Sequence, residues 1–187
     1  TGTNDAPIVS ATDVTGAVTE QVSPAGYLTD SGTISFTDVD LTDIHSLSAV
    51  TPSAGALGSL TASVSSDTSR TTGMGGAVSW NYNVADSAVG YLAKGQTKVE
   101  TFSLNVLDGN GGTVSHTVGV TINGANDDPT LTAGLTDAIG AATEDATSPT
   151  LSDSGTIAFN DVGLIDEHAA SAVAFDANAL GGTLTLG

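Results

Sequence analysis

Apolar and polar residues alternate along most of the first 125 residues, which is the pattern of β-strands buried on one face. The clearest run is AVSWNYNV at residues 77–84, and its apolar face consists of Val78, Trp80, Tyr82 and Val84. TISF at residues 33–36 and GSLTASV at residues 58–64 alternate in the same way. DSAVGYLAKGQT at residues 86–97 could form a turn or two of helix, and no longer amphipathic stretch predicts a helix.

Two further alternating runs flank a glycine-rich turn. ETFSLNVL at residues 100–107 and TVSHTVGVTI at residues 113–122 each have one apolar face, made of Phe102, Leu104, Val106, Val114, Val118, Val120 and Ile122. The intervening DGNGG at residues 108–112 predicts a β-hairpin, because glycine adopts the backbone conformations that tight turns need. Strands divided by Gly, Asp, Asn and Ser clusters over about 100 residues predict a β-sandwich.

One acidic segment occurs twice. DSGTISFTDVDLTDIH at residues 30–45 recurs as DSGTIAFNDVGLIDEH at residues 153–168, with eleven of sixteen positions identical. TNDAP at residues 3–7 likewise recurs as ANDDP at residues 125–129. Because repetition on this scale indicates repeated modules, we assign residues 1–125 to one complete unit and residues 126–187 to a linker and the first half of a second unit.

The second unit has counterparts of TISF and GSLT but none of the Trp80 strand or of the hairpin at residues 108–112. Half a sandwich leaves strand edges and an apolar face uncovered. We therefore expect residues 127–187 either to be poorly ordered or to pair with strands of the first unit or of another molecule.

The chain is strongly acidic, with three Lys and Arg against 21 Asp and Glu in 187 residues and a formal net charge of −18. Such a surface repels nucleic acid and anionic membranes and favours cations. The absence of cysteine excludes disulfides and thiolate metal sites. No apolar run is long enough to insert into a membrane, and the first residues do not resemble a signal peptide, so we interpret the chain as an internal piece of a longer protein.

The first copy of the repeated segment contains a group of carboxylates. Asp38 and Asp40 are two residues apart, so on an extended strand both would project from one face, and Asp43 follows just past the strand end. Oxygen-only clusters suit Ca²⁺, but the spacing does not match an EF-hand, which would need glycine at Asp43 and glutamate at Ala49. Spacing alone leaves two interpretations open, a calcium site and a set of solvated turn residues.

The order of these motifs resembles the VCBS repeat family of large bacterial surface and secreted proteins. The resemblance rests on GTISFTDVDLTDIHSLSAV, then LGSLT, then WNYNVADSAVGYLAKGQTKVETFSLNVLDGNGGTVSHTVGVTINGANDDP. It implies an all-β, Ig-like or cadherin-like β-sandwich repeat, acting as an extension or adhesion module of a type I secreted, RTX-type adhesin in cell adhesion or biofilm formation. It further implies an extracellular or cell-surface location, Ca²⁺ at the junctions between neighbouring repeats of the same chain, and no enzymatic activity.

The resemblance also implies which residues hold calcium. For the junction inside this chain they are Asn126, Asp127, Asp128, Glu144, Asp161 and Asp166. For a junction with a preceding module they are Asn4, Asp5, Glu20, Asp38, Asp40 and Asp43. Gly163 stands where the first unit has Asp40, so the second site should be weaker unless Glu167 or Asp128 substitutes. Asp67, in SSDTSR at residues 65–70, is expected to lie outside these sites.

Other notable residues have simpler explanations. His45 and His168 close the two acidic segments and are expected to be hydrogen-bonded structural groups, and His116 is expected at the edge of the core. Trp80 and Tyr82 could form a sugar platform, but their strand pattern favours core packing. No nucleophile elbow is present in the sequence. Two functions remain: a calcium-stiffened structural repeat, and a module whose own loops bind a glycan or a cell-surface protein of a host.

Overall fold

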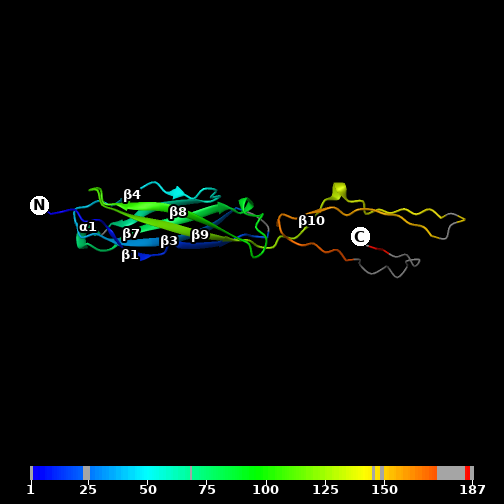
Figure 1. The fold of residues 1–187 in the computed structure, drawn as a ribbon, viewed down its shortest axis with the longest axis horizontal. Coiled ribbons are helices and arrows are strands. Elements are labelled where there is room, and N and C mark those ends of the chain that lie inside the picture. The colour runs from blue at the N-terminus through cyan, green and yellow to red at the C-terminus, as the bar shows by residue number, and fades with distance from the viewer. Residues whose placement is uncertain are drawn as a thin grey trace.

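A computed structural model describes residues 2–22, 26–67, 69–144, 146–147, 150–171 and 184–185. The predicted second unit runs to residue 187, so most of its stretch after Ser171, including the counterpart of GSLT, lies outside the described residues. The described chain is all-β apart from a four-residue helix, α1 (Ser69–Thr72), and two 3₁₀ turns, Asp86–Ala88 and Ala133–Leu135. It forms a β-sandwich that continues into a thin extended arm (Figure 1). Among the described residues, no helix has the length and apolar character to cross a membrane.

The first sheet of the sandwich has the strand order β1-β3-β7-β6, and all of its neighbouring pairs are antiparallel. Its strands are β1 (Ile8–Thr12), β3 (Tyr27–Thr37), β7 (Gly76–Ala85) and β6 (Ser59–Asp67). Gly76 is required where β7 meets β3, because a Cβ atom there would run into the Phe36 ring. In this order the two long strands β3 and β7 form the centre of the sheet, and β1 and β6 form its edges.

The second sheet has the order β2-β9-β8-β4, and β5 also pairs with β8. Its strands are β2 (Thr15–Thr19), β9 (Thr113–Asn123), β8 (Thr97–Leu107), β4 (Ser46–Leu47) and β5 (Thr51–Pro52). The β8–β9 pair is the predicted hairpin, with Phe102 opposite Val118. The β2–β9 pair is parallel, with Thr15 opposite Gly119 and Thr19 opposite Asn123, so both strands finish at the same end of the sandwich.

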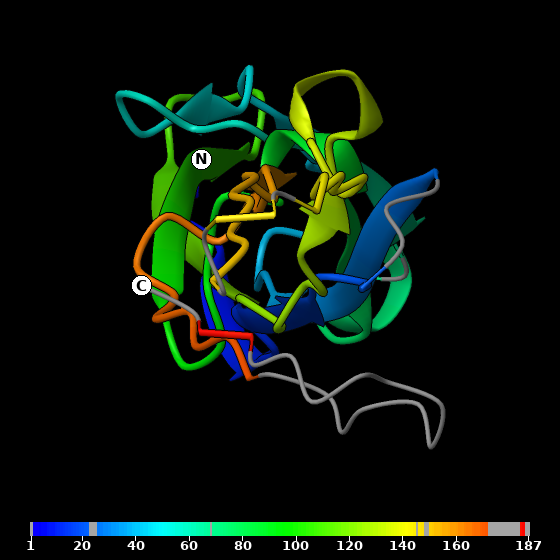
Figure 2. The ribbon, with the colours of Figure 1, turned by 90° about the vertical axis from the view of Figure 1, so that its right-hand side faces the viewer.

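The core lies between the two sheets, whose strands surround it when the molecule is seen end-on (Figure 2). The residues predicted to face inward on β7, β8 and β9 are buried there, except Val114, which is half-buried against the core. Trp80 is fully buried and its indole N–H donates to the Asp13 carbonyl oxygen at 2.6 Å. Because Tyr82 is buried as well, the strand that carries them has no exposed aromatic platform for a sugar.

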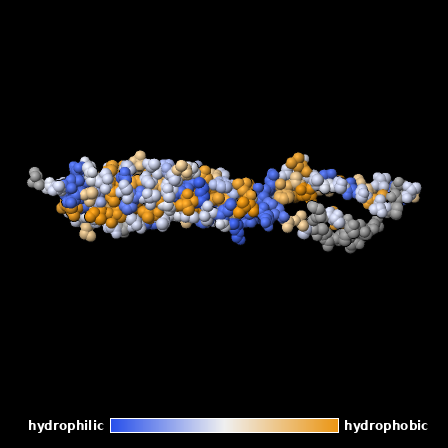
Figure 3. Space-filling model, in the orientation of Figure 1, coloured by the Kyte–Doolittle hydropathy of each residue, from blue (hydrophilic) through white to orange (hydrophobic). Residues whose placement is uncertain are grey.

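The sandwich has two poles, and most of its carboxylates lie at them. We call the end with loops 38–45 and 108–112 the far pole, and the end with residues 20–21, Asp86–Ala88 and 125–127 the linker pole. Hydrophilic surface gathers at both ends of the sandwich in Figure 3. The flanks between the poles carry mainly Ser, Thr and Asn, so the carboxylates of the sandwich are concentrated at its two ends.

The second unit is a narrow antiparallel arm. Its strands β10 (Thr130–Leu131) and β11 (Phe159–Asn160) pair with each other, and Asp137 N–H and Ala141 N–H bond Thr156 O and an Asp153 oxygen further along the arm. Among the described residues these strands do not pair with the first unit, which corrects that part of our expectation. The β10–β11 register matches that of β1 with β3, where Val9 lies opposite Phe36.

Candidate metal centres at the two poles

Three buried carboxylates meet at the far pole. Asp38, Asp43 and Asp108 are each at most 2% exposed, and each offers an oxygen within 4.8 Å of the others. Asp38 follows the end of β3, Asp43 lies five residues later in the same loop, and Asp108 begins the β8–β9 turn. Oxygen donors brought together in this way are the ligands that a hard cation such as Ca²⁺ takes.

Neighbouring polar groups hold these carboxylates in place. The Asn4 side chain donates to Asp108 at 2.9 Å, and the Asn110 side chain donates to Asp43 at 2.7 Å. Burial alone would raise the pKa of Asp108, but the hydrogen bonds from Asn4 and from backbone N–H groups of the turn lower it. The second Asp43 oxygen, Oδ2, is buried and has no hydrogen-bond partner in the described structure. An ion bound beside Asp43 would supply the missing partner.

Asp38 and Asp40 do not share a strand face as the sequence predicts. β3 ends at Thr37, and Asp38 then closes a turn in which its Oδ1 accepts the Asp40 N–H at 2.9 Å. This is the local bonding that makes aspartate a turn residue, and it competes with continuation of the strand. Asp40 points instead to the N-terminal segment, where its Oδ2 accepts the Asp5 N–H at 2.6 Å.

The two histidines make an equivalent Nε2 contact with the aspartate seven residues before them, and His45 makes a second contact through Nδ1. His45 Nε2 lies 3.1 Å from Asp38 Oδ2 and its Nδ1 lies 2.8 Å from Asp67 Oδ1, while His168 Nε2 lies 2.8 Å from Asp161 Oδ2. Each ring also packs on a phenylalanine, with centroids 4.7 Å apart for Phe36 and 4.9 Å for Phe159. The hydrogen bonding that we expect for both histidines is present. Asp67, however, does not lie apart from the site, because it orients the histidine that contacts Asp38.

A second group of carboxylates lies at the linker pole. Glu20, Asp86 and Asp127 are 3%, 0% and 6% exposed, and they come from the end of β2, from the turn after β7 and from the linker. Burial, with the nearby charges of Asp127 and Asp86, raises the pKa of Glu20 although the Ala125 N–H bond opposes it. Burial raises the pKa of Asp127, and so do the charges of the neighbouring aspartates. Burial is the main cause of both pKa shifts and the neighbouring carboxylates add to it, so Glu20 and Asp127 hold protons more readily than ordinary carboxyl groups.

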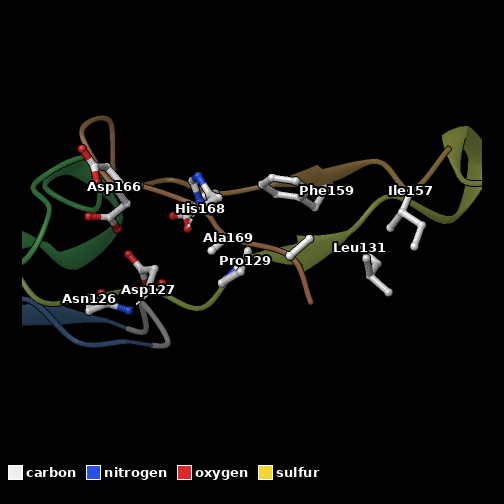
Figure 4. A pocket seen from close by; sticks show the side chains of 12 residues that line it. Asn126, Asp127, Pro129, Leu131, Ile157, Phe159, Asp166, His168 and Ala169 are labelled. Atoms are coloured by element: carbon white, nitrogen blue, oxygen red, sulfur yellow. Dashed lines mark hydrogen bonds and ion pairs between the residues drawn. The ribbon is translucent and has the colours of Figure 1, made fainter. Parts of the chain in front are cut away.

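The second unit completes this group. Asp161 and Asp166 line a pocket of about 620 Å³ together with Asn126, Asp127 and the apolar base of the arm. In Figure 4 the carboxylates of Asp127 and Asp166 face each other across the pocket. The His168 hydrogen bond holds the pKa of Asp161 low, so that carboxylate is ionised. Three buried oxygens here, Glu20 Oε1, Asp127 Oδ2 and Asp166 Oδ2, have no hydrogen-bond partner among the described residues.

The positions of two glutamates differ from the expectation. Glu20 does not lie with Asn4 and Asp38 at the far pole, because the parallel pairing of β2 with β9 carries it to the linker pole. Glu144 is exposed and follows Ala141, beyond the last arm contact described above, so it is remote from the pocket. Each glutamate therefore lies at the opposite end of its own unit from the carboxylates with which it was grouped.

Gly163 affects where the Asp166 carboxylate lies, so the linker-pole group differs from its counterpart in the first unit. A Cβ atom at this position would collide with Asp166 Oδ2, so the glycine makes room for the Asp166 carboxylate. In the first unit Asp40 occupies the equivalent position and Asp43 turns toward Asn110. Glu167 lines the pocket but is exposed, and Asp128 is exposed and does not line it. The equivalent carboxylates of the two units are thus arranged differently.

The sequence did not single out three residues of these centres as ligands. Asp108 and Asn110 belong to the DGNGG turn, which we interpreted only as a hairpin connection, and Asp86 lies in the turn after β7. Asp108 could have been recognised as a candidate ligand because it directly follows the alternating strand segment 100–107 and precedes Gly109. Asp86 carried no such signal, because its role depends on β7 finishing beside the linker.

No family model and no curated protein matches the chain. Among solved structures it is similar to the N-terminal domain of PorA, at a TM-score of 0.38 and 12% sequence identity, over 65% of this chain and 99% of that one. Similarity at this level carries no functional information, so the two candidate metal centres must be interpreted from their own geometry.

Proposed function

We propose that this chain is a calcium-stiffened extension repeat of a large bacterial surface or secreted adhesin, built from VCBS-like, cadherin-like modules. In this role the protein is not an enzyme. Ca²⁺ ions at the poles fix the angle between neighbouring repeats, and the repeats together hold an adhesive region away from the cell. The partners of each module are then the modules before and after it in the same chain.

The convergence at the linker pole is the observation that carries this proposal. Asp127 of the linker lines one pocket with Asp161 and Asp166 of the second unit, and it lies within electrostatic reach of Glu20 and Asp86 of the first unit. Three buried carboxylate oxygens of this group have no hydrogen-bond partner among the described residues. No Lys or Arg pairs with Glu20, Asp127 or Asp166 in the described part of the chain. Buried carboxylate oxygens that have neither a cation nor a hydrogen bond are costly, and Ca²⁺ would compensate them because it takes six to eight oxygen ligands in flexible geometry.

The same residues explain why the ion would stiffen the chain. Without it, Asp127 is repelled by Glu20 on one side and by Asp161 on the other, which favours separation of the two units. With it, each carboxylate is attracted to a common centre, and opening the junction requires breaking several bonds to the ion. The angle between the two units then depends on calcium, and a calcium-free chain samples more angles.

Isothermal titration calorimetry tests the proposal with two adjacent aspartates. Asp127→Asn removes a buried carboxylate of the linker pole, whereas Asp128→Asn makes the same charge change at an exposed position. We expect wild type and Asp128→Asn to bind Ca²⁺ with equal stoichiometry and Asp127→Asn to lose one binding event. Equal isotherms for the two variants would contradict a calcium site at the junction, and a flat wild-type isotherm would remove the proposal altogether.

Calcium affinity should fall as the pH is lowered. The raised pKa values of Glu20 and Asp127 mean that these groups bind protons at pH values where ordinary carboxylates are ionised, and calcium must displace those protons. The calcium-free protein should show the opposite trend in stability from these two groups, since a raised carboxyl pKa favours the folded state at low pH and that contribution is lost as the pH rises. Titrations from pH 5 to 7.5, in buffers of different ionisation enthalpy, would measure the protons released. A pH-independent affinity without proton release would contradict this assignment of ligands.

A further inference from the structure

The two candidate metal centres differ in how closely their ligands are assembled before an ion arrives. At the far pole, ligand oxygens of Asp38, Asp43 and Asp108 already lie within 4.8 Å of one another. In the part of the chain that the structure describes, this is the only group of three acidic or histidine side chains whose ligand atoms lie that close together. The carboxylates of the linker pole are neighbours, but they must move before three of them could share one ion.

The far-pole ligands are all held by one sandwich. Asp38 lies in the loop after β3 of the first sheet, and Asp108 begins the turn between β8 and β9 of the second. Asn110 of that turn donates to Asp43 at 2.7 Å, so the two loops are already joined, and the buried Asp43 Oδ2 has no hydrogen-bond partner in the described structure. Because folding of the sandwich has ordered these ligands, an ion that binds them pays little further ordering cost.

The linker-pole ligands belong to different parts of the chain. Glu20 and Asp86 are fixed to the sandwich, Asp127 lies in the linker, and the pocket beside it is lined by Asp161 and Asp166 of the arm. Among the described strands, none of the arm pairs with one of the sandwich, so no sheet hydrogen bonds fix the distance between the two sets of carboxylates. An ion there must hold the arm and the sandwich together, and the free energy of that closure is subtracted from its binding free energy.

We propose that calcium acts on this chain in two steps, in which the far pole fills first and the linker pole fills only at a higher calcium concentration. This inference rests on the proposed function, since both centres must take Ca²⁺. If the closed junction is populated about a tenth of the time without the ion, the apparent dissociation constant of the linker pole rises about tenfold. Between the two concentrations the sandwich is already stabilised while the angle between the units is still free. The hinge therefore responds to calcium without any unfolding of the module.

Backbone amide NMR signals measure the two steps separately in the intact chain. The Gly112 N–H bonds Asp108 at the far pole, and the Gly163 N–H bonds Asp161 at the linker pole. In a calcium titration we expect the Gly112 signal to reach its final position at about tenfold less calcium than the Gly163 signal. Both signals following one curve, Gly163 changing first, or Gly112 not changing at all would overturn the two-step order and leave the proposed junction intact. A Gly163 signal that calcium never changes would overturn the junction as well.

Two glycine variants test whether the steps are separate without changing any charge. Gly163→Ala displaces the Asp166 carboxylate, because the added Cβ atom would collide with Asp166 Oδ2, whereas Gly134→Ala is the matched control in the arm, with no atom within 4 Å of its added Cβ. We expect Gly163→Ala to move the linker-pole transition, measured at the Ala125 N–H that bonds Glu20, to higher calcium and to leave the Gly112 transition in place. Gly134→Ala should move neither. If Gly163→Ala moves both transitions together, the centres fill as one unit and the proposal is wrong.

Discussion

Calcium at about 10 mM is expected to stabilise the sandwich by roughly 2.7 kcal/mol for each candidate metal centre that binds Ca²⁺ with a dissociation constant near 10⁻⁴ M. Both centres contain residues of the first unit, so its thermal midpoint should rise by about 5–10 °C when one of them is filled. The physical reason is that, under the proposed function, the ion binds folded carboxylates such as Asp43 and Glu20, which have buried oxygens without a hydrogen-bond partner, and has no equivalent site in the unfolded chain. Differential scanning calorimetry with calcium and with chelator, at equal ionic strength, measures the shift.

Variants assign that shift to the two poles. Asp43→Asn should remove the far-pole share, Asp127→Asn the linker-pole share, and the double variant the whole of it. Asp128→Asn should keep the full shift, because its side chain is exposed. Magnesium at the same concentration should have a smaller effect, since it demands a rigid octahedral shell and releases water reluctantly. A thermal midpoint that is the same with calcium and with chelator would falsify the prediction.

Glu100→Ala is expected to destabilise the sandwich by about 3 kcal/mol, independently of calcium. Glu100 is 1% exposed, and its carboxylate accepts the Leu57 N–H at 2.6 Å, the Gly58 N–H at 3.0 Å and the Tyr82 hydroxyl at 3.0 Å. Burial, and then its bond to Glu100, raises the pKa of Tyr82, so the hydroxyl stays protonated and keeps donating. Removing the carboxylate leaves three donors without an acceptor and releases the loop that leads into β6.

Urea denaturation of three variants separates these contributions. Tyr82→Phe removes one donor and keeps the ring, so it should cost about 1 kcal/mol. Glu100→Gln keeps one acceptor oxygen and should fall between Tyr82→Phe and Glu100→Ala. If Glu100→Ala and Tyr82→Phe have the same midpoint, the two backbone bonds contribute nothing and the loop is held by its other contacts.

The strands of the sandwich were predictable because apolar and polar residues alternate within each strand segment. Val78, Trp80 and Tyr82 face the core as their spacing indicates, and the glycine-rich turn after Leu107 connects β8 with β9. The positions of the carboxylates along the molecule were harder to predict. Glu20 was grouped with the wrong residues because the sequence does not reveal that β2 runs parallel to β9.

Local bonding explains another difference. The alternation of Asp38 and Asp40 predicts that the strand continues through both residues. Instead the Asp38 side chain accepts a hydrogen bond from the Asp40 N–H, and β3 ends at Thr37, one residue before Asp38. Asp86 belongs to the linker-pole group because the end of β7 lies close to Asp127 of the linker. This contact is between residues far apart in the sequence. Residue type and spacing therefore predict that oxygen ligands are present, and strand direction decides which of them meet.

The parallel pairing of β2 with β9 has a consequence for a chain that is pulled from its two ends. The segment before β2 leads back toward the far pole and the segment after β9 leads into the linker, so tension along the axis in Figure 1 draws the two strands in opposite directions. The hydrogen bonds from Thr15 to Asn123 lie across that direction and share the load, instead of opening one after another as at the end of a hairpin. A module arranged in this way resists being drawn out by flow or by a moving surface, and it gives way only when the whole β2–β9 ladder slides at once.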